Sequence, residues 1–317
     1  MSFPNKNSED HSGVYTLYQW PSSEYTDSIY VRCTKIQRVL GYLGVPYRVA
    51  EISLPLGGND KELSNKINPL MRKIPILQVS HKYIEETSSI VAFLIQETGK
   101  QNFRYKQKKG KPSPAFFLNH WVEQWLVWMV IYGRWHVEAN YQRFIKTVGK
   151  IDQRLLLKSG LSYTRKRACD ILAKTEVGQM SFRQYLNELE QGCIKLESVL
   201  EHSPFLTGSE MSETDLGLFM CMQAFLDPSL AEESHIVTQY PSLCRWAKLV
   251  DQETSTPHTK PVKILYGEAE AQNQDESDSD DASSESSGSE GNNPEENPME
   301  SAEAGNDISG FADALEA

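Results

Sequence analysis

NPLMRKIPIL, residues 68–77, followed by ETSSI, residues 86–90, is the stretch of this sequence that decides its fold. Its Asn-Pro pair favours a turn, and the apolar run after it, Ile74–Val79, predicts a β-strand. Pro75 has no N–H to donate, so we expect it at a sheet edge or a special turn. Thr87 begins a helix where a strand ends, and the free N–H groups of such a helix start attract an anion. The stretch therefore predicts a strand and a helix start that suits a negatively charged group.

The segments around this stretch complete an α/β domain. Runs of β-branched and aromatic residues predict strands at Val14–Trp20, Val45–Ile52, Ile74–Val79 and Tyr83–Glu85. Between the first two, a helix with one apolar face begins near Asp27 or Ser28, either of which can cap it, and ends at Gly44. A short helix before the third strand and the helix at Thr87 give the order β-α-β-α-β-β-α. Strands that alternate with helices and end in a hairpin are typical of one compact α/β domain.

The sequence after residue 114 shows helical periodicity and no convincing strand. Its clearest feature is a row of aromatic residues at steps of four, three, four and three: Trp121, Trp125, Trp128, Tyr132 and Trp135. This spacing predicts an amphipathic helix whose aromatic side chains form domain core rather than a stacking platform. Ser212 and Asp215 have the pattern of a capping box, a structural role. Further helices are expected at Ile151–Leu157, Lys166–Thr175, Ser181–Leu200, Glu213–Leu226 and Leu243–Val250.

Charge divides the chain into a body and a tail. Of the 43 acidic residues, 16 follow Gly267, where no Lys or Arg occurs, which leaves 27 acidic against 32 basic residues before it. The tail is rich in Ser, Glu, Asp and Asn and poor in large apolar residues, a composition that predicts disorder. We therefore expect a disordered N-terminus (residues 1–13), an α/β domain (14–99), a basic linker (100–114), a helical domain (115–255), and a linker with the acidic tail (256–317).

The cysteines and the apolar segments favour a cytoplasmic protein without a membrane span. Five cysteines, an odd number with no paired CxxC spacing, suit reduced thiols in a cytosol-like compartment. The longest apolar run, Trp121–Tyr132, contains Glu123 and Gln124 and is too short to cross a bilayer. No His/Cys spacing predicts a metal site, and the basic linker lacks the aromatic residues of RNA-binding motifs. We therefore expect neither a metal nor a nucleic-acid partner.

Four segments resemble signatures of the glutathione S-transferase superfamily. NPLMRKIPIL is similar to the family's NP…K-V-P-x-L, and ETSSI to its E-S-x-A-I motif. Phe205–Leu216 resembles the G-x-x-x-S-x-A-D helix start of the family's second domain, and Pro241–Trp246 resembles its P-x-L-x-x-W last helix. The four segments occur in the family's order. The resemblance implies a thioredoxin-like α/β domain followed by an all-helical domain.

The resemblance also implies where glutathione binds. In the family the proline of the first motif is cis, and the residue before it, here Ile74, pairs through its backbone with the cysteinyl part of glutathione. In the second motif the acid, here Glu86, takes the ammonium group, and the hydroxyl residue, here Thr87 in place of serine, holds the γ-glutamyl carboxylate. A simple capping threonine is the alternative interpretation of Thr87. The implied substrate-binding residues are therefore Lys73, Ile74, Pro75, Glu86 and Thr87, with glutathione as co-substrate.

The residue that activates the glutathione thiol is marked less clearly. Counting back from Gly44–Tyr47, which resembles the family's G-I-x-Y, places Tyr30 where many members carry Ser or Cys. Ser28 lies one step from the serine site. Tyr18 falls near the family's other option, a tyrosine at the end of the first strand, and Cys33 lies where glutaredoxin-like relatives carry a second cysteine. We rank Tyr30 first and Ser28 second as the catalytic residue, ahead of Tyr18 and Cys33.

Two functions follow from these residues. The first is an enzyme that adds glutathione, or transfers thiol, to a small hydrophobic electrophile held by the helical domain. The second is a non-catalytic protein of the same fold, similar to the metaxins or the failed-axon-connections group, whose acidic tail recruits protein partners. The two intact motifs favour the enzyme, whereas the unclear thiol-activating residue and the long tail favour the scaffold. The family also implies a homodimer.

Overall fold

A four-stranded sheet lies in the N-terminal part of the chain. The computed structural model describes residues 15–52, 74–103, 114–149 and 155–264. The strands, in the sheet order β2-β1-β3-β4, are β1 (Tyr15–Gln19), β2 (Tyr47–Glu51), β3 (Ile76–Val79) and β4 (Lys82–Glu85). All four confirm predicted strands, whereas the short helix predicted before β3 lies outside the described residues.

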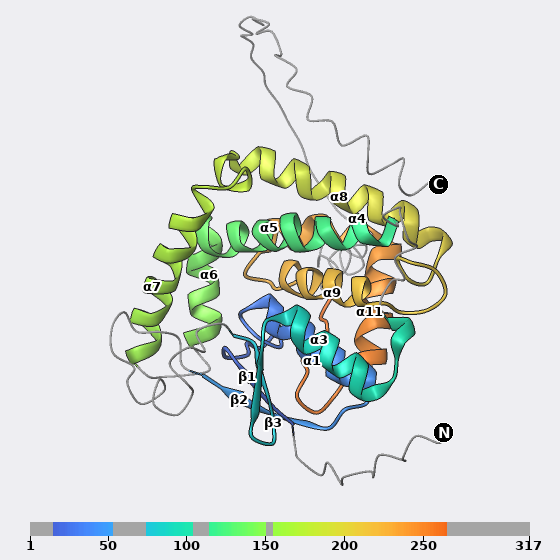
Figure 1. Cartoon of the computed structure of the whole chain (residues 1–317). Helices are drawn as coiled ribbons and strands as arrows, with labels where there is room; N and C mark the ends of the chain where they lie inside the picture. The colour runs from blue at the N-terminus through green and yellow to red at the C-terminus, as the bar shows by residue number, and fades with distance from the viewer. Residues whose placement is uncertain (1–14, 53–73, 104–113, 150–154, 265–317) are drawn as a thin grey trace, which may run out of the picture. The chain divides into compact units, whose positions relative to one another are not determined.

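The strand directions bring the starts of two helices to one edge of this sheet. β1 runs antiparallel to β3, and β3 runs antiparallel to β4, so β1 and β4 point the same way. α1 (Val31–Leu43) follows β1 after a loop, and α3 (Thr87–Thr98) follows β4 directly. The two helices lie side by side (Figure 1). Their N-termini therefore lie at the same end of the sheet, where β1 and β4 stop, and we call this end the shared edge. This is the predicted thioredoxin-like arrangement.

The start of α1 differs from the sequence prediction. Its end is as expected, because Gly44 adopts φ 69°, a left-handed conformation that favours glycine at a helix C-terminus. At the other end the N-cap is Tyr30, which makes no side-chain cap hydrogen bond, and neither Asp27 nor Ser28 caps the helix. The Asp27 carboxylate is instead bound by the guanidinium of Arg38, one of the most deeply buried side chains.

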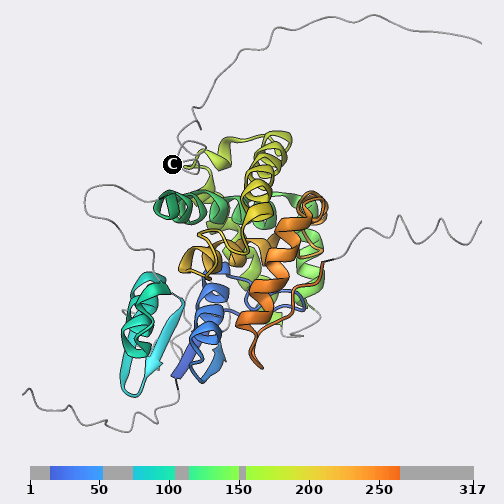
Figure 2. The same cartoon turned by 90° about the vertical axis from the view of Figure 1, so that its right-hand side faces the viewer.

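Beyond residue 114 the described chain is helical, as predicted. The α-helices are α4 (Pro114–Trp121), α5 (Val127–Ile131), α6 (Glu138–Gly149), α7 (Leu155–Leu172), α8 (Phe182–His202), α9 (Glu213–Phe225), α10 (Ala231–Thr238) and α11 (Pro241–Thr254). Every residue of α9 is buried, and α11 lies beside α1 (Figure 2). The sequence predicted neither α6 nor α10, and the eight residues of α10 (AEESHIVT) are too few and too polar to show a helical apolar stripe.

The helical stretch from α4 onward contains two π-turns. They are η2 (Val122–Leu126), between α4 and α5, and η3 (Tyr132–His136), after α5. Such turns widen a helix locally and often occur at functional sites. The predicted aromatic row follows this stretch, but only its last two members, Tyr132 and Trp135, are buried. The prediction that the row forms domain core is therefore confirmed for these two residues, whereas Trp121, Trp125 and Trp128 are partly buried.

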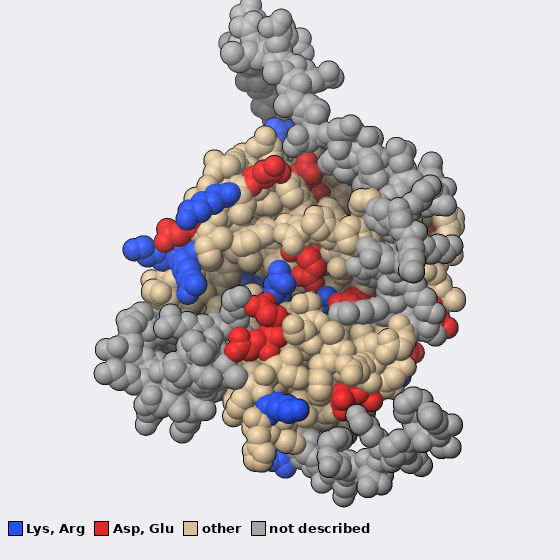
Figure 3. All heavy atoms as spheres, in the orientation of Figure 1, with Lys and Arg blue, Asp and Glu red and all other residues tan. Residues whose placement is uncertain are grey.

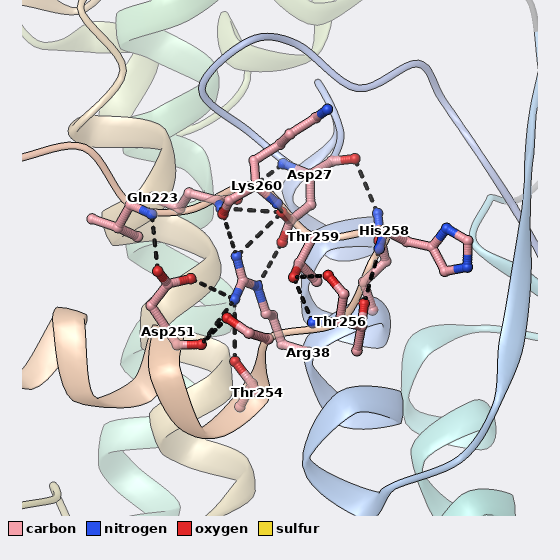
Figure 4. A network of polar contacts seen from close by, with 12 residues as sticks. Asp27, Arg38, Gln223, Asp251, Thr254, Thr256, His258, Thr259 and Lys260 are labelled. Carbon is pink, nitrogen blue, oxygen red and sulfur yellow. Dashed lines mark hydrogen bonds and ion pairs between the residues drawn. The ribbon is translucent and has the colours of Figure 1, made fainter.

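A buried arginine joins the α/β domain to the helical domain. In the network of Figure 4, Arg38 Nε donates to Asp27 Oδ2 (2.6 Å), Nη1 to Asp251 Oδ1 (2.6 Å), and Nη2 to the Lys260 carbonyl (2.7 Å). The side chains of Arg38 and Asp27 are both 0 % exposed. The guanidinium also lies 4.6 Å from the centre of the Phe219 ring. One side chain thus connects the β1–α1 loop, α9, α11 and the segment after it.

Residues 255–264, which we call the strap, return from α11 to the α/β domain (Figure 4). The Thr256 hydroxyl lies 2.9 Å from the Tyr47 hydroxyl, and the Lys260 N–H donates to Asp27 Oδ1 at 2.5 Å. Farther on, Lys263 Nζ lies 3.2 Å from Glu24 Oε1. The structure therefore places the strap with the folded unit, which ends at Ile264, rather than with the tail.

The capping box at the start of α9 is confirmed. The Asp215 carboxylate accepts hydrogen bonds from the N–H and the hydroxyl of Ser212, at 2.9 and 2.7 Å. It also accepts from the Leu206 N–H (2.9 Å) and from the indole N–H of Trp246 (3.0 Å). Asp215 is fully buried, so its four donors, rather than water, satisfy this carboxylate. Its role is structural, as the sequence indicated.

Two helical glycines give a matched test of the packing between α1 and the end of α11. A Cβ on Gly41 would lie 2.2 Å from the carbonyl oxygen of Thr254, whereas a Cβ on Gly217 would meet nothing closer than 3.6 Å. We expect Gly41→Ala to lower the free energy of unfolding by about 1–3 kcal/mol, because backbone must move. Gly217→Ala should be neutral or stabilising, since alanine favours helix. Urea unfolding of both variants checks this, and equal effects would contradict the packing.

Candidate functional site

The residues implied to bind glutathione gather at the sheet edge that the starts of α1 and α3 share. The strand register sets Tyr18, Ile76 and Glu85 side by side across β1, β3 and β4. Ile74 precedes this row by two residues and Glu86 follows it by one, so the two motifs meet at one edge. The Ile74–Pro75 peptide bond is cis. Lys73 lies outside the described residues.

Glu86 and Thr87 form the turn from β4 into α3. Glu86 is exposed and is the N-cap of the helix, and Thr87 is the first helical residue, buried at 6 % exposure. The backbone of Glu86 adopts φ 63° and ψ 127°, a conformation rare outside glycine. Strained residues of this kind cluster at ligand sites. The turn thus presents an acidic side chain next to the N–H groups of a helix start, a combination that suits a ligand carrying both an ammonium and a carboxylate.

Tyr30 occupies the corresponding turn into α1. It is half-buried, and its ring centre lies 5.2 Å from that of Trp20. Burial raises the pKa of Tyr30; Arg32 offsets part of this effect, whereas Glu123 and Glu86 add to it. Glu86 belongs to a different element from Tyr30, so its electrostatic effect on the Tyr30 pKa agrees with both residues lying at the shared edge. A phenol that stays protonated at neutral pH can donate a hydrogen bond to an anionic sulfur.

The other three thiol-activating candidates are engaged elsewhere. Ser28 is 1 % exposed, and its hydroxyl donates to the Trp20 carbonyl (2.9 Å) and accepts from the Tyr30 N–H (3.2 Å). Cys33 is fully buried, and burial raises the pKa of its thiol to about 12. The Tyr18 hydroxyl donates to Gln78 Oε1 at 2.7 Å. Ser28 and Cys33 are therefore buried, whereas Tyr18 and Tyr30 are both partly exposed.

A charged cluster next to Tyr30 was not predicted from the sequence. Lys35 of α1 lies 2.9 Å from Glu123 and 3.3 Å from Glu213, and Arg32 lies 2.9 Å from the other oxygen of Glu123. The π-turn η2 carries Glu123, so this turn places its carboxylate against α1. A sequence signal existed, because Glu123 interrupts the longest apolar run, but the sequence does not show which basic residues it meets. The cluster joins the helical domain to the helix that Tyr30 begins.

The cluster makes stability depend on pH. Burial alone would raise the pKa of Glu123, but Lys35 and Arg32 outweigh it and hold that pKa below its usual value. A carboxylate with a lowered folded pKa stabilises above its unfolded pKa, about 4.3, and loses that effect as the pH falls through the folded value. We expect Glu123→Gln to lower the free energy of unfolding by about 2 kcal/mol at pH 7. Urea unfolding should show this difference shrinking below about pH 4.3; a difference that stays constant down to acid pH would contradict the ion pairs.

The face shown in Figure 3 carries interspersed acidic and basic side chains with broad uncharged areas between them. Within the described ranges there is no group of three His, Cys, Asp or Glu side chains that would hold a metal ion. None of the helices in those ranges is both long and apolar enough to cross a bilayer.

Comparison with known protein families gives a match for the N-terminal part of the chain. Residues 17–102 match the family model of the glutathione S-transferase N-terminal domain. No curated protein matches the chain. The match covers both motifs, Tyr30 and the whole four-stranded sheet except its first two residues.

Several solved structures are similar to the described fold. A Tau-class glutathione S-transferase from mango (Mangifera indica) is 16 % identical with a TM-score of 0.44, over 78 % of this chain and 91 % of its own. A glutathione transferase from Phanerochaete chrysosporium, solved with oxidized glutathione, is 18 % identical with a TM-score of 0.45, over 78 % and 94 %. Poplar glutathione transferase F1 is 13 % identical with a TM-score of 0.43, over 76 % and 93 %. Residues 17–102 therefore form a domain that matches the glutathione S-transferase N-terminal domain.

Proposed function

We propose that this protein binds glutathione at the shared sheet edge and joins its sulfur to a small hydrophobic electrophile. One observation carries the proposal, namely the register that brings Ile74, Glu86 and the start of α1 to that edge. The backbone of Ile74 pairs with the cysteinyl part of glutathione, and Glu86 with Thr87 binds the γ-glutamyl end. Lys73 and Pro75 complete the first motif. The substrate class follows from the chemistry of glutathione, a thiol that reacts with electron-poor carbon.

Tyr30 acts on the sulfur in this proposal. A thiol of pKa about 8.5 is roughly 3 % ionised at pH 7, and lowering its pKa by about 2 units raises that fraction to roughly 75 %. The Tyr30 phenol supplies part of this effect as a hydrogen-bond donor, together with the positive end of the α1 dipole. The thiol proton passes to solvent. The sulfur lone pair then forms the bond to the electrophilic carbon, whose leaving group departs with the bonding electrons.

Tyr30→Phe and Ser28→Ala separate the two ranked catalytic residues. We expect Tyr30→Phe to lower kcat/KM for conjugation of glutathione to an aryl chloride by about 10–100-fold, because the sulfur loses a hydrogen bond from its donor. Its rate–pH profile should shift to higher pH. Ser28→Ala should mainly lower stability, since the buried hydroxyl holds two backbone groups. Unchanged conjugation in Tyr30→Phe, with loss in a stably folded Ser28→Ala, would reverse the ranking.

The second candidate is a non-catalytic scaffold whose acidic tail recruits protein partners. The burial of Ser28 and Cys33 favours it, because the two residues of the commonest thiol-handling types are withdrawn from the edge. Glutathione binding without conjugation of any electrophile would support this candidate. In either case we propose a cytoplasmic homodimer, which sedimentation of the full chain and fractionation of cells would test.

A further inference from the structure

Arg134 is a buried charged residue that no part of the proposed chemistry uses. It lies in the π-turn η3 and is 1 % exposed, and its Nη1 donates to the carbonyl of Ile29 at 2.8 Å. Ile29 belongs to the β1–α1 loop and immediately precedes Tyr30. The helical domain thus contacts the backbone of the α/β domain one residue before the proposed thiol-activating tyrosine.

This contact fixes the peptide group that leads into Tyr30. Arg134 donates a hydrogen bond to the oxygen of this peptide group, the Ile29 carbonyl. The N–H of the same peptide group, on Tyr30, donates to the Ser28 hydroxyl. The preceding N–H, on Ile29, donates to the Pro21 carbonyl at 2.8 Å. With the neighbouring peptide groups held in this way, rotation about the Tyr30 backbone, and hence the direction of its ring, is restricted.

The ion pair with Asp227 does not by itself explain why the Arg134 side chain is buried. Its Nη2 lies 3.7 Å from Asp227 Oδ2, which is longer than a hydrogen bond, and both atoms lack a hydrogen-bond partner among the described residues. Burial lowers the pKa of Arg134, and Asp227 compensates only in part. A buried ion pair of this quality is often no better than apolar packing of the same volume. The hydrogen bond to Ile29 is the contact that apolar packing could not replace.

We propose that Arg134 is a positioning residue for Tyr30, through which the helical domain sets the direction of the phenol toward the glutathione sulfur. This inference rests on the proposed function, in which Tyr30 donates to that sulfur. The π-turn η3 carries Arg134, whose side chain reaches the loop at Ile29. Loss of Arg134 should therefore disturb the site without removing any group that touches glutathione.

The test compares Arg134→Met with a control that weakens the same domain elsewhere. Leu196→Ala, in α8, leaves a cavity at a side chain that is 2 % exposed and lowers stability without touching Ile29. Glutathione affinity is measured by calorimetry on the full-length proteins at a temperature where each is folded. In parallel, protein labelled with ¹³C-carbonyl isoleucine and ¹⁵N-tyrosine gives one correlation for each Ile-Tyr pair, Ile29–Tyr30 and Ile131–Tyr132.

We expect Arg134→Met to shift the Ile29–Tyr30 correlation and to weaken glutathione binding about tenfold, because Tyr30 no longer directs its hydrogen bond to the sulfur. Leu196→Ala should leave both unchanged. Arg134→Lys, which keeps a donor in reach of the carbonyl, should restore part of the affinity. An unmoved Ile29–Tyr30 correlation, or equal weakening by Arg134→Met and Leu196→Ala, would overturn the role of Arg134. Absence of glutathione binding in the wild type would refute the proposed function instead, and the correlation would still decide whether Arg134 holds the Ile29–Tyr30 peptide group.

Discussion

Arg38→Met should lower the free energy of unfolding by about 3–5 kcal/mol, the largest effect we expect from a single substitution. Methionine keeps an unbranched apolar side chain but removes every donor that Asp27, Asp251 and the Lys260 carbonyl now use. Burial already raises the pKa of Asp27 in spite of Arg38. Without the guanidinium, this carboxylate would stay buried with a charge that only the Lys260 N–H and Gln223 could stabilise.

Urea unfolding followed by circular dichroism would measure this effect. Arg48→Ala is the matched control, because Arg48 is exposed on β2, and we expect it to change stability by about 0.5 kcal/mol or less. The double variant Arg38→Met with Asp27→Asn should be less destabilised than the sum of the single variants, since it removes the unpaired charge. A loss below about 1 kcal/mol for Arg38→Met would contradict the role of the network as the junction between the two domains.

The fold could be predicted from the sequence because its signals are local. Strands such as Ile76–Val79 show as apolar runs, and the end of α1 shows as a glycine with positive φ. The capping box at Ser212 and Asp215 depends on residues three apart, so it was also visible. Failures occurred where long-range contacts override local preference. Asp27 has the chemistry of a helix cap, yet it pairs with Arg38 and, through the strap, with a residue 233 positions away.

The candidate site could be predicted only in part for the same reason. The motifs around Ile74 and Glu86 are contiguous in sequence, and strand pairing brings them together. The cluster of Lys35, Glu123 and Glu213 assembles from three distant segments, and nothing local marks its partners. Arg134 is similar, because a basic residue in an aromatic helix gives no sign that its side chain reaches the carbonyl of Ile29.

Glu86→Ala should abolish or strongly weaken glutathione binding, the largest functional effect we expect. Glu86 is exposed at the N-cap of α3, next to the buried Thr87 and at the shared edge. Loss of its carboxylate would leave the ammonium group of glutathione without its charged partner, which corresponds to at least about a tenfold loss of affinity. Glu85→Ala is the matched control, because Glu85 precedes Glu86 in the chain, carries the same charge and belongs to the paired part of β4.

Calorimetric titration of the purified full-length protein with reduced glutathione tests the central claim most directly. We predict saturable binding that Glu85→Ala retains and Glu86→Ala loses. Absence of heat up to millimolar glutathione, or equal weakening by the two substitutions, would contradict a glutathione site at this edge of the sheet.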